Sequence, residues 1–195
     1  MNEHLDKNYW SQRYRNEQIA WDAGSVTTPI KEYIDQLSDK SISILIPGAG
    51  NAYEAEYLHQ QGFRNVTVLD ISPEPLENMR RRIPSFPEHQ LVNGDFFEHT
   101  GTYDLIFEQT FFCAIDPGLR AEYAKKMHSL LRPSGQLTGV LFNSNLSIEG
   151  PPFGGTKEEY LNYFQPYFKI SKFEDCYNSI KPRAGKELFI RLQKK

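Results

Sequence analysis

The chain contains 195 residues, of which 39% are hydrophobic and 24% are charged. This length and composition are typical of one globular domain and exclude a disordered chain. The net charge is −3 and the basic residues are scattered, so the sequence lacks the basic surface that binds nucleic acid or anionic membranes. We therefore predict a single domain over residues 1–195 and a small-molecule partner rather than a nucleic acid.

Targeting and cysteine patterns narrow the class of protein further. No apolar segment approaches the roughly 20 residues of a membrane-spanning helix, and the polar start MNEHLDKNYW is unlike a signal peptide. These features predict a cytoplasmic protein that does not enter a membrane. Cys113 and Cys176 lack metal-ligand spacing, so we expect neither a disulfide framework nor a metal site.

In chain order, the first predicted elements are two helices. One covers residues 5–16 and the second begins at Pro29, which suits a first helical turn, and ends near Leu37. Five short apolar runs then have the pattern of strands that are covered on both faces. These runs are residues 43–46, 66–69, 90–93 (the weakest), 104–107 and 137–142.

Helices are expected between these strands, after Asn51, Ser72 and Asp116, whose side chains are typical of helix N-caps. After the last of the five strands come a Gly- and Pro-rich loop, a helix near 156–165, and two more strand candidates. The repeated strand-helix order predicts an α/β fold. Its doubly wound, mostly parallel sheet carries helices on both faces and an antiparallel late strand.

The turn after the first strand, ILIPGAGNAYE, has the features of a ligand site. Gly48 and Gly50 allow a tight turn and a close approach of a ligand to the backbone. Asp70 ends the second strand, 20 residues after Gly50, where a carboxylate can accept hydrogen bonds from a ribose diol. A glycine turn alone is more often structural, but this combination predicts a bound nucleotide-type cofactor.

One mismatch indicates which cofactor it is. Tyr53 stands where a dinucleotide fingerprint requires a small residue, which disfavours pyrophosphate and an NAD-dependent oxidoreductase. S-adenosylmethionine has a ribose and an adenine but no phosphate, and aromatic faces can hold its sulfonium. Trp10, Tyr14 and Trp21 are candidates for this role; alternatively, they only attach the N-terminal helix to the core.

Two later segments complete the predicted site. Asp95 and Phe96 follow the third strand, where the carboxylate can accept from an adenine amino group and the ring can flank the adenine; alternatively, Asp95 is only a turn residue. Residues 108–117 follow the fourth strand, where the methyl group and its acceptor should meet. In this segment we expect Cys113 to pack in the core, and Glu108 is a candidate general base.

These residues resemble the thiopurine S-methyltransferase family, which includes thiol and halide methyltransferases of plants and bacteria. The similarity runs from about Tyr9 to Arg191, through WDAGSVTTP, ILIPGAGNAYE, VTVLDIS, NGDFF, FFCAIDPGLR and GPPFGG. The resemblance implies a Rossmann-like class I methyltransferase. Such an enzyme would transfer a methyl group from S-adenosylmethionine, with S-adenosylhomocysteine as product, to a small soft nucleophile such as a thiol or hydrosulfide.

The resemblance also implies roles for single residues. Residues 1–28 would cover the cofactor, and Phe153 matches an aromatic lid position. Arg120 and Arg183 match substrate-side arginines, which would favour the thiolate form of the acceptor; the alternative is that both are solvated surface residues. The positions that match cofactor contacts are Trp10, Tyr14, Trp21, Gly48, Gly50, Asp70, Ile71, Asp95, Phe96 and Gln109.

Departures from the family pattern bear on the acceptor. Gln109 stands where plant relatives have Tyr, and Phe153 lacks the hydroxyl of the halide-transferring plant relatives, which favours thiol over halide chemistry. Halide transfer, O- or N-methylation with a general base, and a cofactor-binding protein with little activity remain alternatives. We expect a monomer, with a lid formed by segments 9–28 and 143–155 because both contain glycines and water must be excluded during transfer.

Overall fold

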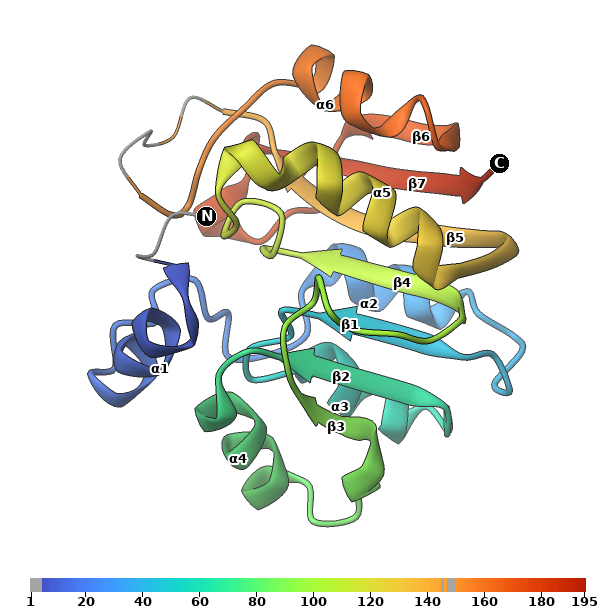
Figure 1. Cartoon of the computed structure of the whole chain (residues 1–195). Coiled ribbons are helices and arrows are strands. Elements are labelled where there is room, and N and C mark those ends of the chain that lie inside the picture. Colours follow the sequence, from blue (N-terminus) through green and yellow to red (C-terminus); the bar gives the residue numbers. More distant parts are fainter. Residues whose placement is uncertain (1–4, 145, 147–149) are drawn as a thin grey trace.

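The computed structural model describes residues 5–144, 146 and 150–195. Its strands are β1 (Ile44–Pro47), β2 (Val66–Asp70), β3 (Leu91–Asn93), β4 (Tyr103–Gln109), β5 (Leu131–Phe142), β6 (Phe168–Asp175) and β7 (Glu187–Lys194). They form one sheet in the order β3-β2-β1-β4-β5-β7-β6 (Figure 1). The first five strands are parallel, and β7 is antiparallel to both of its neighbours, which confirms the predicted topology.

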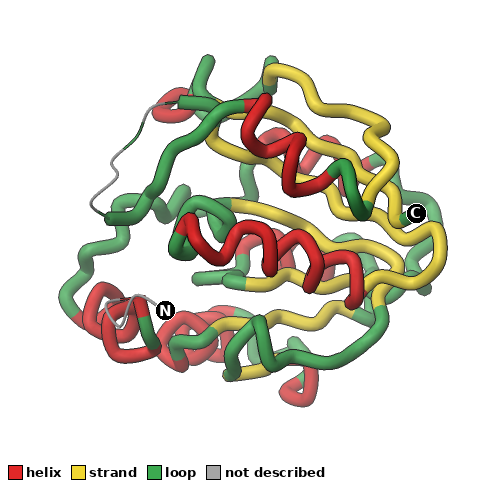
Figure 2. Tube along the Cα trace, turned by 45° about the horizontal axis from the view of Figure 1, so that its top comes forward, coloured by secondary structure: helices red, strands yellow, loops and turns green. Residues whose placement is uncertain are grey.

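Helices cover both faces of this sheet (Figure 2). One face packs against α2 (Thr28–Asp35), α3 (Tyr53–Gln60) and α4 (Pro73–Arg82), and the other against α5 (Arg120–Leu130) and α6 (Lys157–Phe164). The apolar residues of the parallel strands are buried between the two layers, as continuous apolar runs require. In the described part of the chain, none of the helices is long and apolar enough to cross a membrane.

The helix after the glycine turn differs from the prediction at its first residues. Ala52, in the left-handed conformation with φ of 56°, is the N-cap residue of α3. Asn51 instead donates a hydrogen bond to Asp22 and accepts one from Asn78 at 3.0 Å. The prediction that Asn51 caps this helix was wrong because its side chain binds residues that are distant in sequence.

The boundaries of two later elements also differ from the prediction. Asp116 accepts a hydrogen bond from the Gly118 N–H at 2.8 Å and so caps a short 3₁₀ turn, Pro117–Leu119, that precedes α5. The strand β5 begins at Leu131 rather than at residue 137, because Leu131 pairs with Tyr103 across a local irregularity of the sheet.

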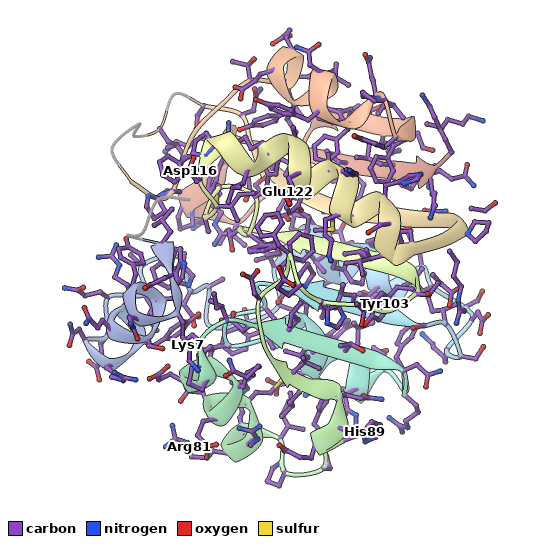
Figure 3. All side chains as sticks on the ribbon, in the orientation of Figure 1. Lys7, Arg81, His89, Tyr103, Asp116 and Glu122 are labelled. Atoms are coloured by element: carbon purple, nitrogen blue, oxygen red, sulfur yellow. The ribbon has the colours of Figure 1, made fainter. Side chains whose placement is uncertain are left out.

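The parallel strands all end at one edge of the sheet, which we call the carboxyl edge. In Figure 1 the arrowheads of β1, β2 and β4 point towards the side where α1 (Lys7–Arg15) lies. This helix is attached to α4 through a buried contact between the hydroxyls of Ser11 and Ser72, 3.1 Å apart, and an ion pair between Arg15 and Glu74 at 2.5 Å. Lys7, labelled in Figure 3, lies on the same helix. The N-terminal segment therefore lies on the side of the sheet where the turns after β1, β2 and β4 begin.

Candidate active site

The glycine turn lies at the centre of the carboxyl edge. Gly48 and Gly50 have φ values of 56° and 54°, which side chains other than glycine rarely adopt. A Cβ at Gly48 would lie 2.3 Å from the ring of Phe111, and one at Gly50 would lie 2.9 Å from the Tyr14 hydroxyl. Both glycines are therefore required by their backbone conformation and by an aromatic ring that lies against the turn.

Asp70 is held beside this turn by backbone groups. It is 7% exposed, and its two carboxylate oxygens accept hydrogen bonds from the Gly50 and Ser72 N–H groups, each at 2.8 Å. Burial raises the pKa of Asp70 to about 6, against the opposing effect of these two bonds. Each oxygen keeps a second lone pair, so the carboxylate can still accept from a ribose hydroxyl.

The ends of β2 and β3 are joined through Asn93. Its side-chain amide donates to the carbonyl oxygens of Asp70 and Ile71, both at 2.9 Å. Ile71, the next residue after Asp70, is half-buried.

Asp95 and Phe96 have different surroundings. Asp95 accepts from the Phe97 N–H at 2.8 Å, so the turn role considered for it is confirmed, although this bond uses only one of its oxygens. Phe96 is buried, and its ring centroid lies 5.2 Å from that of Phe111 in an edge-to-face contact. The loops after β3 and β4 thus meet through two rings above the glycine turn.

Gln109 carries a buried donor that has no protein partner. Its amide oxygen accepts from the Thr27 hydroxyl at 2.9 Å. Within the described residues, its amide nitrogen is buried and makes no hydrogen bond. An unsatisfied buried donor costs about 1–3 kcal/mol, so an acceptor that reached this N–H group would stabilise the site.

The three aromatic residues of the N-terminal segment form one cluster. The ring of Trp21 meets those of Trp10 and Tyr14 nearly at right angles, with centroids 5.6 Å and 5.8 Å apart. The Tyr14 hydroxyl also lies against Gly50, and burial raises the pKa of Tyr14 far above its usual value. The cluster both attaches the segment to the turn and presents aromatic rings to the site.

Arg183 is buried rather than solvated. It is 7% exposed, donates to the Trp21 carbonyl at 2.6 Å, and lies 3.6 Å from a carboxylate oxygen of Glu187. Its remaining contact is with the ring of Phe142, 5.9 Å from the guanidinium carbon. Among the described residues, its Nη1 atom has no hydrogen-bond partner.

Arg120 is buried more completely, with 2% exposure. Its guanidinium donates to the Gly154 carbonyl and pairs with Glu159, both at 2.8 Å, and it lies against the rings of Phe112 and Tyr160. The alternative prediction, that both arginines are solvated surface residues, was therefore wrong. A sequence pattern does not show burial that is created by contacts from other elements.

Phe153 is buried on the loop that Arg120 holds. Its N–H donates to the Cys113 carbonyl at 2.8 Å, which joins this loop to the segment after β4. Cys113 is itself buried, as predicted, and burial raises the pKa of its thiol, so it is neutral at physiological pH. A narrow cleft at the ends of β4, β5 and β7 is lined by Cys113 together with Glu108, Phe142 and Glu187.

Two residues at this site were missed by the sequence analysis. Phe111 covers Gly48, and Thr27 binds Gln109. The only signal for Phe111 was the pair of phenylalanines directly after a strand end, and Thr27 gave none because its partner lies 82 positions away.

The strand order, the glycine turn after β1 and the acid at the end of β2 define a class I methyltransferase fold. A solved structure with the same fold is the 1,6-didemethyltoxoflavin-N1-methyltransferase of Burkholderia thailandensis, determined with S-adenosylhomocysteine bound. It matches 97% of this chain and 87% of its own with a TM-score of 0.75 and 21% sequence identity.

The chain belongs to the thiopurine S-methyltransferase family, whose sequence model, "Thiopurine S-methyltransferase (TPMT)", matches residues 5–193. A probable thiol methyltransferase 2 of Arabidopsis thaliana is 30% identical over 191 residues, which cover 95% of this chain and 84% of the relative. Thiocyanate methyltransferase 1 of the same plant is 30% identical over 196 residues, covering 97% and 86%. The protein is an S-adenosylmethionine-dependent methyltransferase, and the resemblance seen in the sequence is confirmed.

Proposed function

We propose that this enzyme methylates a small thiol or hydrosulfide, bound as its anion at the carboxyl edge between β4 and β5. The observation that carries the proposal is the buried guanidinium of Arg183, whose Nη1 has no hydrogen-bond partner within the described chain. The carboxylate of Glu187 lies 3.6 Å from this Nη1 atom, beyond hydrogen-bond distance. A nearby guanidinium favours the thiolate form of a thiol.

The cofactor contacts that we propose agree with the geometry described above. S-adenosylmethionine supplies an electrophilic methyl group on a sulfonium. Gly48 and Gly50 allow it to approach the backbone, Asp70 accepts from the ribose, and Gln109 provides a free donor. The other proposed contacts are Trp10, Tyr14, Trp21, Ile71, Asp95 and Phe96.

The remaining task of the protein is to align the two reactants and to exclude water. Alignment alone contributes about 7–11 kcal/mol in well-oriented reactions. We propose that Phe153 closes the acceptor side of the site, and that Arg120 acts by holding the loop of Phe153 through the Gly154 carbonyl. In this arrangement Arg183 faces the acceptor and Arg120 positions the lid.

The test is turnover on a panel of acceptors, followed by release of S-adenosylhomocysteine. We expect turnover on hydrosulfide and thiophenols, and slower turnover on thiocyanate and iodide because Phe153 has no hydroxyl. Turnover on phenols or amines but not on thiols would indicate O- or N-methylation. Cofactor binding without turnover on any acceptor would indicate a cofactor-binding protein with little activity.

A matched pair of variants tests the role of Arg183. Arg183→Met should raise the KM for hydrosulfide by a larger factor than the Kd for S-adenosylhomocysteine, because the guanidinium acts directly on the acceptor and on the cofactor only through its bond to the Trp21 carbonyl. Arg81→Met removes an exposed arginine on α4, labelled in Figure 3, and should change neither quantity. Equal effects of both variants would contradict the role of Arg183.

We also propose that the enzyme is a cytoplasmic monomer that binds no nucleic acid. The acidic net charge and the scattered basic residues support this proposal. Light scattering on the purified protein should give a mass of about 22.6 kDa.

A further inference from the structure

The turn that follows β4 contains a strained residue. Thr110 has φ of 59°, in the left-handed region. For a β-branched residue this conformation is a genuine outlier, because the side chain crowds the backbone. Such strain persists only where the surrounding structure holds the residue in place, and it is frequent at functional sites.

The group that holds this turn is the carboxylate of Glu108. One of its oxygens accepts hydrogen bonds from the Phe111 and Phe112 N–H groups, at 2.8 Å and 2.9 Å. The other oxygen accepts from the Tyr123 hydroxyl. Glu108 is 1% exposed, so these bonds are shielded from water. The carboxylate thus binds the two residues that directly follow Thr110.

The same turn places two side chains at the cofactor site. Gln109 precedes Thr110 and carries the buried amide nitrogen without a partner in the described chain. Phe111 follows Thr110, and its ring lies directly over Gly48. A relaxed turn would move both side chains away from the glycine turn.

We infer that Glu108 is a positioning residue, which holds the left-handed turn at Thr110 and so places Gln109 and Phe111 against the bound cofactor. This role differs from that of a general base, the function considered for Glu108 in the sequence. One of its oxygens accepts from two backbone N–H groups and the other from the buried Tyr123 hydroxyl. With 1% exposure, the carboxylate is also shielded from an acceptor molecule in the site. Burial raises the pKa of Glu108 to about 7, so at that pH the backbone N–H groups still face a partly ionised acceptor.

The test uses the Kd for S-adenosylhomocysteine, measured by calorimetric titration, in a set of variants. Glu108→Ala removes the carboxylate that offsets the cost of the left-handed conformation at Thr110, which is roughly 1.4 kcal/mol. It should therefore raise the Kd by about tenfold. Glu108→Gln should stay close to the wild type, because its amide oxygen can accept from the same two N–H groups. Circular dichroism and thermal unfolding of each variant show that the fold is retained.

The decisive comparison is rescue by a second substitution. Thr110→Gly in the Glu108→Ala background should restore most of the affinity, because glycine adopts the left-handed conformation without strain. Ser134→Gly is the matched control: Ser134 also has a left-handed φ, of 64°, but lies in the long strand β5 away from the turn. In the Glu108→Ala background, Ser134→Gly relieves the same kind of backbone strain at a distant position and should restore no affinity for S-adenosylhomocysteine.

Two results would overturn the inference. One is a Glu108→Ala variant that is folded and binds with wild-type affinity, or whose lost affinity Thr110→Gly does not restore. The other is a Glu108→Gln variant with unchanged affinity but with the acidic limb of its pH-rate profile abolished, which indicates a general base. The inference rests on the proposed cofactor contacts, and failure of the wild-type chain to bind S-adenosylhomocysteine would contradict those contacts instead.

Discussion

Three charged side chains at the carboxyl edge are each held by a backbone group from another part of the chain. Asp70 accepts from the Gly50 N–H, Arg183 donates to the Trp21 carbonyl, and Arg120 donates to the Gly154 carbonyl. These charges are buried, so their positions are determined by hydrogen bonds to the main chain rather than by solvent. Substitution at such a residue is therefore expected to change binding through loss of specific bonds.

Replacement of Asp70 tests the proposed ribose contact. Asp70→Ala should weaken the binding of S-adenosylhomocysteine by a few kcal/mol, at roughly 1.5–3 kcal/mol for each charge-assisted hydrogen bond lost. Asp70→Asn keeps the shape and should lose less. Calorimetric titration of both variants provides the measurement, and unchanged affinity in Asp70→Ala would refute the ribose contact.

Two glycine substitutions separate backbone strain from a blocked site. Gly48→Ala adds a methyl group that meets the Phe111 ring at 2.3 Å, in addition to the cost of a positive φ. Gly62→Ala has the same type of φ, +90°, but nothing lies within 4 Å of its new methyl group. We expect both to lower thermal stability and only Gly48→Ala to weaken cofactor binding. A similar loss of affinity in both variants would show that the contact with Phe111 is unimportant.

At the scale of elements, two segments close the carboxyl edge from opposite sides. The N-terminal segment is attached by α1 to α4 and by the Trp21 carbonyl to Arg183. The segment around Phe153 is attached by Arg120 and by the Cys113 carbonyl. Residues 145 and 147–149 of the predicted lid segment 143–155 lie outside the described residues.

Limited proteolysis tests the lid. S-adenosylhomocysteine should protect segments 9–28 and 143–155, because closure over the ligand removes both from the protease. Arg120→Lys should increase cleavage in the second segment only, since one ammonium does not replace a planar guanidinium that binds Gly154 and Glu159 together. Mass spectrometry locates the cleavage sites. Cleavage that is the same with and without the ligand would rule out the lid.

At the scale of the whole molecule, folding places four carboxyl groups, those of Glu54, Asp70, Glu108 and Glu187, where burial raises the pKa. A raised carboxyl pKa means that the folded state binds a proton in a pH range where the unfolded chain has already released it. The free energy of unfolding contributed by such a group therefore falls as the pH rises. At neutral pH these buried carboxyl groups therefore lower the free energy of unfolding, and such a loss of stability is common at functional sites.

Glu54 provides the measurable case, because burial raises its pKa from 4.5 to about 7. Relative to Glu54→Gln, the wild type should lose free energy of unfolding as the pH rises from about 4.5 to about 7, which urea denaturation at several pH values measures. Glu122→Gln changes an exposed glutamate on α5, labelled in Figure 3, and should show no such difference. Parallel curves for the wild type and Glu54→Gln would contradict the prediction.

Local sequence was sufficient for the parts of this protein that depend on local chemistry. Continuous apolar runs predicted the parallel strands, since a strand covered on both faces needs apolar residues throughout. Gly48 and Gly50 predicted the turn after β1, because glycine is the residue that most readily adopts a positive φ. Asp70, at the end of the second strand, predicted the carboxylate beside this turn. The family, the fold and the cofactor followed from these segments and are confirmed.

Only the tertiary structure decided how the other residues are used. Asn51 binds Asp22 rather than capping its helix, Phe111 covers Gly48, and Arg120 lies against two aromatic rings. Each of these contacts joins residues that are far apart in sequence, so no local pattern contains them. The left-handed conformation of Thr110 also depends on the tertiary structure, because the buried carboxylate of Glu108 holds the turn in a conformation that threonine alone disfavours.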